Sequence, residues 1–139
     1  MRKLLLFIPA FALMFACNKN GNKTACGIHV CNDVFMNITV VFADKTGKLI
    51  FITNYSAVNQ RTNLPLQHEG LNIPVALTYH YPVADDSMRD QISTDGDNIL
   101  VTGTNPNTGQ TKSATFDISG GCNCHVQKIS GQDTIRFDQ

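Results

Sequence analysis

Two short clusters of cysteine and histidine contain the side chains of this sequence best suited to chemistry. They are Cys26, His29 and Cys31 near the start, and Cys122, Cys124 and His125 near the end. Thiolates and imidazoles bind zinc or copper, whereas paired thiols in an oxidising compartment form disulfides. The choice between the two chemistries therefore depends on where the chain resides.

The N-terminus has the pattern of an export signal. Arg2 and Lys3 precede an uncharged, apolar run over residues 4–16. This run is shorter than the roughly 20 residues that a membrane-spanning helix needs, and it ends on the small residue Ala16. We expect residues 1–16 to be a secretory signal peptide.

Cys17 follows this leader directly, in the sequence Leu-Met-Phe-Ala-Cys over residues 13–17. The segment resembles the lipobox of bacterial lipoproteins. The resemblance implies that the leader is cut before Cys17 and that this cysteine carries covalent lipid, the only non-protein group expected. Several acyl chains on one residue hold a protein stably to a membrane. The resemblance thus places the protein in the bacterial cell envelope, anchored by lipid, and we expect the outer membrane.

Export favours disulfides for the four cysteines that remain. A bridge between Cys122 and Cys124 is disfavoured, because in an extended segment their Cα atoms would lie near or beyond the disulfide limit. Two cross-pairings stay open. One joins Cys26 to Cys124 and Cys31 to Cys122; the other joins Cys26 to Cys122 and Cys31 to Cys124. The alternative is a zinc or copper site built from all six residues of the two clusters, although their spacing is not that of paired C-x-x-C knuckles.

The elements that must position these residues are mostly strands, because the sequence is rich in strand and turn formers. In residues 34–42, Val34, Met36, Ile38, Val40 and Phe42 alternate on one face. Further strands are expected at 48–53, 73–81, 98–104, 111–118, 122–129 and 134–137, with one short helix at 85–92. We expect turns at 44–47 and 105–109.

This rhythm predicts an all-β domain, an antiparallel β-sandwich of about seven strands, over residues 34–139. It resembles the immunoglobulin-like or transthyretin-like sandwiches of bacterial surface lipoproteins. Residues 17–33 would then be the lipidated cysteine, a polar spacer and an N-terminal segment fastened to the domain by the disulfides.

The segment 55–70 is polar and irregular, and we expect it to be a loop that offers a binding surface. Its candidate binding residues are Arg61, His68 and Glu69. An acidic group further on could in principle gather around calcium. It comprises Asp85, Asp86, Asp90, Asp95 and Asp97. Helix caps and turns explain the same residues without an ion.

The charge balance argues against nucleic acid as a partner, since 11 Lys and Arg match 11 Asp and Glu. No nucleophile with an evident base and no known catalytic motif appears, so we do not expect an enzyme. The expected function is a non-catalytic binding or structural module whose partner is an envelope protein or glycan. The alternatives are a metal-binding envelope protein, and an inhibitor or adhesin that presents the 55–70 loop.

Overall fold

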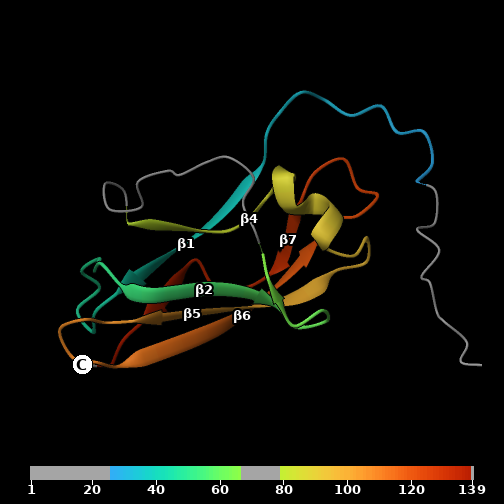
Figure 1. Ribbon diagram of the computed structural model, residues 1–139. Coiled ribbons are helices and arrows are strands. Elements are labelled where there is room, and N and C mark those ends of the chain that lie inside the picture. The colour runs from blue at the N-terminus through green and yellow to red at the C-terminus, as the bar shows by residue number, and fades with distance from the viewer. Residues whose placement is uncertain (1–25, 67–78, 139) are drawn as a thin grey trace, which may run out of the picture.

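The computed structural model describes residues 26–66 and 79–138. Within these ranges the chain is all-β, with eight strands and one short 3-10 helix arranged around two sheets (Figure 1). The expected β-sandwich is therefore confirmed. The expected signal peptide, Cys17, His68 and Glu69 lie outside the described residues.

The smaller sheet has three strands in the order β4-β1-β8. Its central strand β1 (Asn37–Ala43) pairs antiparallel with β4 (His80–Asp85) and parallel with β8 (Thr134–Arg136). A strand near the start of the domain thus lies between one from the middle and one from the end, so this sheet joins distant parts of the chain.

The larger sheet has five strands in the order β3-β2-β5-β6-β7. They are β2 (Thr53–Asn59), β3 (Leu64–Pro65), β5 (Asp97–Thr104), β6 (Thr111–Ser119) and β7 (Gln127–Ser130). The β5–β6 hairpin pairs without interruption from Asp97 opposite Ile118 to Thr104 opposite Thr111. The turn at 105–109 closes it as expected, with Gly109 at φ 70°.

Apolar side chains of both sheets meet in one core. Val40 and Phe42 of β1 are almost fully buried, as are Ile99 of β5 and Phe116 of β6. The Phe42 ring meets Tyr81 edge-on at a centroid distance of 5.4 Å. Because side chains alternate across a strand, each of these positions follows from the two-residue period of the sequence.

The short helix η2 (Asp86–Gln91) lies between β4 and β5 and adopts 3-10 geometry. Asp85 caps it by accepting a hydrogen bond from the Ser87 backbone N–H, and the side chain of its own residue Met88 is buried in the core. The helix expected at 85–92 is therefore confirmed. In the part of the chain that is described, no helix has the length and apolar character needed to cross a membrane.

Two strand predictions near the start of the domain are only partly confirmed: residues 37–42 of the strand expected at 34–42 lie in β1, whereas only Thr53 of the strand expected at 48–53 lies in a strand. Residues 34–36 belong to no strand, and Val34 and Met36 are exposed rather than inward. Residues 48–52 form no strand beyond an isolated bridge between Leu49 and Ala43, because this segment crosses from the smaller sheet to the larger one. The turn at 44–47 before it is confirmed, with Gly47 at φ 92°.

Two further boundaries differ from expectation. Part of the strand expected at 73–81 lies outside the described residues, and the observed β4 continues past Pro82 to Asp85. Proline is tolerated there because, among the described strands, β4 lies at the edge of its sheet, and because the β1–β4 register shifts between Ile38 and Thr39, next to Pro82. The second difference concerns the loop expected at 55–70, because its residues 55–59 belong to β2, inside the larger sheet.

The strand expected at 122–129 is also largely wrong. Residues 121–125 form a turn, in which the Asn123 N–H donates to the Gly120 carbonyl at 2.9 Å, and only Gln127–Ser130 pair as β7. Gly121 has φ 56°, a left-handed conformation that glycine adopts without strain. The Cys122–Cys124 segment is therefore curved, not extended.

Candidate functional site

The four cysteines form two disulfides. The first cysteine of the early cluster bonds to the first of the late cluster, and the second bonds to the second. Cys26 joins Cys122 and Cys31 joins Cys124, with Cα atoms 5.1 and 5.3 Å apart. Of the two cross-pairings open from the sequence, the structure contains the second. The bridges fasten the segment before β1 to the turn between β6 and β7.

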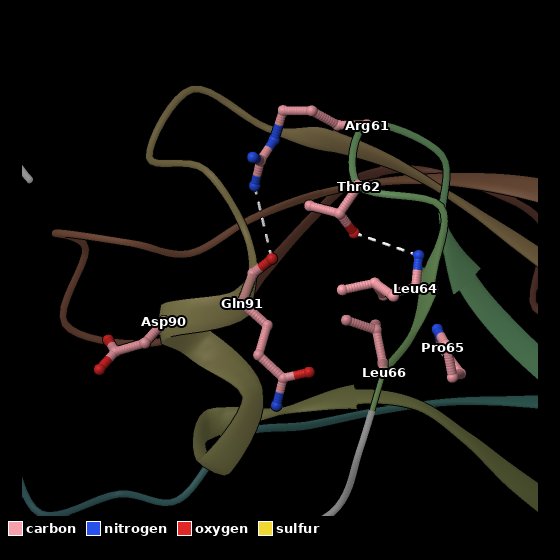
Figure 2. A pocket seen from close by; sticks show the side chains of 7 residues that line it. All are labelled: Arg61, Thr62, Leu64, Pro65, Leu66, Asp90 and Gln91. Carbon is pink, nitrogen blue, oxygen red and sulfur yellow. Dashed lines mark hydrogen bonds between the residues drawn. The ribbon is translucent and has the colours of Figure 1, made fainter. Parts of the chain in front are cut away.

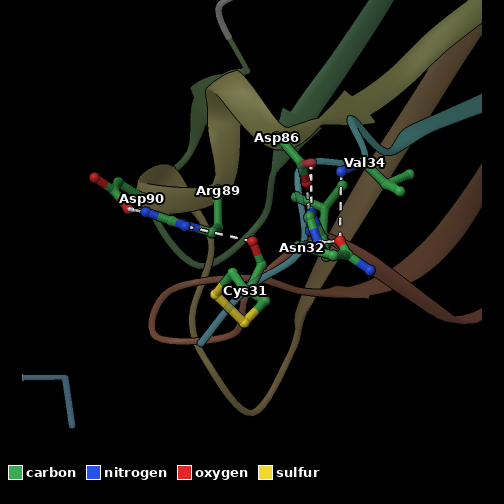
Figure 3. Close-up of a disulfide and its surroundings, with 9 residues drawn as sticks. Cys31, Asn32, Val34, Asp86, Arg89 and Asp90 are labelled. Atoms are coloured by element: carbon green, nitrogen blue, oxygen red, sulfur yellow. Dashed lines mark hydrogen bonds and ion pairs between the residues drawn. A yellow bond between two sulfur atoms is a disulfide. The ribbon is translucent and has the colours of Figure 1, made fainter. Parts of the chain in front are cut away.

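Asp86, the first residue of η2, joins the same two segments without a covalent bond (Figure 3). Its carboxylate accepts hydrogen bonds from the backbone N–H groups of Met36 at 2.8 Å and Val126 at 2.9 Å. It also lies 2.8 Å from Nδ1 of His125. Burial disfavours the ionised carboxylate, but these three contacts outweigh it, so the pKa of Asp86 lies below its ordinary value.

His125 completes this contact through its second ring nitrogen, because Nε2 lies 2.6 Å from Oδ1 of Asn32. Both ring nitrogens are thus engaged by side chains of the protein itself. We name Asp86, His125, Asn32 and the two disulfides the junction. The polar side chains of the junction bond to one another and its cysteines are bridged, so the junction is a structural connection between the N-terminal segment and the sandwich.

The alternative zinc or copper site does not form from the six predicted ligands. The disulfides use the sulfurs of Cys26, Cys31, Cys122 and Cys124, and His29 is exposed. Within residues 26–66 and 79–138, no three Cys, His, Asp or Glu side chains converge as metal ligands, and this includes the five aspartates weighed for calcium. Asp85 caps η2, Asp86 belongs to the junction, and Asp97 accepts a hydrogen bond from Arg61.

Arg61, the predicted binding residue that the structure describes, lies in a tight turn after β2 and pairs with Asp97 at the start of β5. Its Nε and Nη2 donate to the two carboxylate oxygens at 2.7 and 2.8 Å. Asn59 Nδ2 donates to the same carboxylate at 2.7 Å, and Ser93 donates through its backbone N–H and its hydroxyl. The Asp97 side chain is 2% exposed, whereas that of Arg61 is 53% exposed.

Burial disfavours a charge on Asp97, but the hydrogen bonds from Arg61, Asn59 and Ser93 stabilise the carboxylate by more. The pKa of Asp97 is consequently well below its ordinary range. The same contact raises the pKa of Arg61, so the pair is ionised at neutral pH. Asp97 thus fixes a guanidinium group whose other side faces outward.

A cavity of about 410 Å³ opens beside this arginine (Figure 2). One side is formed by Arg61, Thr62, Leu64, Pro65 and Leu66, and the other by Asp90 and Gln91 of η2. Arg61 Nη2 also reaches the Gln91 carbonyl at 3.5 Å, which ties the turn to the helix. The cavity presents the fixed Arg61 guanidinium beside apolar leucine and proline side chains, with the Asp90 carboxylate on the η2 side, while the Thr62 hydroxyl bonds to the Asn59 carbonyl and the Leu64 N–H.

The sequence does not by itself identify the pairing of two polar groups that build this site. Asn59 and Asp97 are buried with 1% and 5% exposure. The sequence does contain one indication that they are buried. Asn59 is two positions from buried Ala57 and Asp97 is two positions from buried Ile99, so each lies on the same face of its strand as a core residue. A polar side chain on the buried face of a strand needs a hydrogen-bond partner, and here Asn59 and Asp97 bond to each other.

Comparisons with models of protein families, with curated proteins and with solved structures find no match to this chain.

Proposed function

We propose that this protein is a lipid-anchored, non-catalytic binding module of the bacterial cell envelope. The lipobox-like sequence at residues 13–17 supplies the anchor, and the observation that carries the proposal is the position of the disulfides. Both join the segment that follows Cys17 to the sandwich. Because of these bonds, the segment through which the domain would be held to a membrane keeps a fixed position on the sandwich.

The two bridges also support an oxidising compartment, where such bonds form and persist. The lipid on Cys17 and the disulfides thus indicate the same side of the membrane. The binding role is supported by the cavity at Arg61, whose guanidinium is oriented by Asp97 and is half exposed. A guanidinium beside apolar side chains suits a partner with acceptor oxygens, such as a glycan or the backbone of an envelope protein.

Metabolic labelling with a clickable fatty acid tests the anchor. In a bacterium that processes lipoproteins, the full chain should be labelled and found in the membrane fraction, and its leader should be cut before Cys17. The Cys17→Ala variant should lose the label. The double variant Cys26→Ser/Cys122→Ser is the matched control, because it also removes cysteines but should keep the label. An unlabelled wild-type chain with its leader intact would contradict the proposal.

Site-specific photo-crosslinking in cells tests the binding role. A photoreactive residue in place of Thr62, at the cavity, should give one adduct of defined mass. The same residue in place of Thr108, exposed in the β5–β6 turn, should not. Equal adduct patterns at both positions would argue against a binding site at Arg61.

A further inference from the structure

Exposed apolar side chains are concentrated in the short segment that precedes β1. Among the described residues ten large apolar side chains are exposed, and five of them lie between residues 28 and 36. They are Ile28 (103% exposed), Val30 (99%), Val34 (55%), Phe35 (55%) and Met36 (40%). We call this set the apolar segment. Single exposed apolar residues are ordinary, but such a concentration marks a surface that is covered in use.

The apolar segment is held outside the core by the junction. The disulfides at Cys26 and Cys31 fix its first half to the turn at 122–124, and the Met36 N–H donates to Asp86 at its end. Asp33 is the only acidic side chain between residues 26 and 36, and no lysine or arginine occurs there. Transfer of this segment to a less polar environment would therefore bury few charges.

Its place in the chain indicates what covers it. Cys26 follows the proposed acylated Cys17 by nine positions, so the intervening chain spans at most about 30 Å when extended. A surface tethered this close to a bilayer meets it at a high effective concentration, and even weak apolar contacts then suffice. Lys19 and Lys23 lie in the connecting sequence and would favour anionic lipid headgroups.

We propose that the apolar segment docks on the lipid surface and inserts its side chains at the boundary between headgroups and acyl chains. This inference rests on the lipid anchor proposed above and deepens it, because it defines an orientation. The end of the sandwich that carries η2 and the junction faces the membrane. The opposite end, with the turns at 44–47 and 105–109, faces away (Figure 1).

Fluorescence of single tryptophans tests the orientation directly, since the chain contains no tryptophan. Phe35→Trp places a reporter in the apolar segment. Phe51→Trp is the matched control, because Phe51 is 45% exposed and follows Leu49, which bridges to the far end of β1. Each acylated variant, with its leader removed, is reconstituted into phosphatidylethanolamine and phosphatidylglycerol vesicles, with and without brominated acyl chains.

We expect brominated lipid to reduce the tryptophan emission of the Phe35→Trp variant by about twofold or more, and to leave that of the Phe51→Trp variant unchanged. Ile28→Trp, the second reporter, should behave like Phe35→Trp. Intact mass reports whether the disulfides have formed in each variant.

Equal quenching of the Phe35→Trp and Phe51→Trp variants, or quenching of neither, in an acylated protein that floats with the vesicles would overturn the inference and leave the anchor standing. A chain that carries no lipid and does not float would overturn both.

Discussion

At the scale of single residues, Asp97 shows how a buried charge is made stable. Its carboxylate is 2% exposed and accepts hydrogen bonds from Arg61, Asn59 and Ser93. An ionised carboxylate without such partners would be very costly in this position, and the partners would in turn be left unsatisfied without it. Asp97 therefore links the end of β2, the start of β5 and the cavity beside Arg61 in one arrangement.

Asp97→Asn should lower the free energy of unfolding at pH 7 by about 2–3 kcal/mol, because the new amide N–H₂ faces donors from Arg61 and Asn59. The pH dependence should change as well. Since the pKa of Asp97 is lower in the folded state, its ionisation stabilises the fold above the ordinary pKa of about 4, and this contribution is lost as the pH falls below that value.

Urea unfolding at pH 7 and at pH 3 measures both effects. The wild type should lose stability on acidification, and Asp97→Asn should lose distinctly less. The control is Asp95→Asn, a change of the same type at an exposed position two residues away, which should match the wild type at both values of pH. A wild-type acid dependence retained in full by Asp97→Asn would show that Asp97 is not its source.

At the scale of elements, how well the sequence predicts a strand depends on what its inward face carries. Strands β1, β5 and β6 each place at least two large apolar residues inward at alternate positions, such as Ile99 and Val101 of β5, and this periodicity is sufficient to find them. Strand β2 places Tyr55, Ala57 and Asn59 inward, a polar and irregular pattern that predicts a loop instead. Local signals for turns and for the η2 cap are reliable because the residues involved act on their own backbone.

Contacts between distant segments can be predicted only in part. Export and spacing limit the cysteines to two cross-pairings, and only the curved turn at 121–125 and the direction of the N-terminal segment decide between them. The contact between Asp86 and His125 has no local signature, because 39 positions separate the two residues. The residue type of Arg61 makes it a candidate, but nothing in the sequence pairs it with Asp97.

Gly103, the next-to-last residue of β5, gives a test of how the two sheets pack. A methyl group at its Cα would lie 2.3 Å from Ile52 Cδ1 and 2.8 Å from the Phe42 ring, so these side chains occupy the space that a residue would need. Gly103→Ala should therefore destabilise the fold by about 1–3 kcal/mol through overpacking. Thermal unfolding followed by circular dichroism measures the loss.

The control for this variant is Asn98→Ala, on an exposed position of the same strand, which should change stability by no more than about 0.5 kcal/mol. A stable Gly103→Ala protein would mean that Ile52 and Phe42 can move aside, and that the packing at this position is looser than described.

At the scale of the whole molecule, the two disulfides close almost the same loop, with separations of 96 and 93 residues. Once either bridge is present, the other closes only the small ring formed by residues 26–31 and 122–124. In the chain-entropy account, the stabilisation by a disulfide grows with the length of the loop it closes. Removal of the first bridge, whichever it is, should therefore lower the free energy of unfolding by less than removal of the second.

Removal of one bridge, in Cys26→Ser/Cys122→Ser or in Cys31→Ser/Cys124→Ser, should cost about 2–3 kcal/mol, and removal of the remaining bridge about 5 kcal/mol more. Chemical denaturation of the two double variants and the quadruple variant, all with Cys17→Ser to exclude other thiols, measures the difference. If the losses of the two double variants add up to that of the quadruple variant, the shared-loop explanation is wrong.

The position of the bridges also decides how tension passes through the protein. A pull on the N-terminal segment reaches Cys26 first and crosses to Cys122, so the load bypasses β1, which begins eleven positions later at Asn37. It enters instead beside β6, which is paired with β5 along its length. The first strand of the chain, β1, thus belongs to the smaller sheet, but a force applied at the N-terminus is transmitted to the larger sheet.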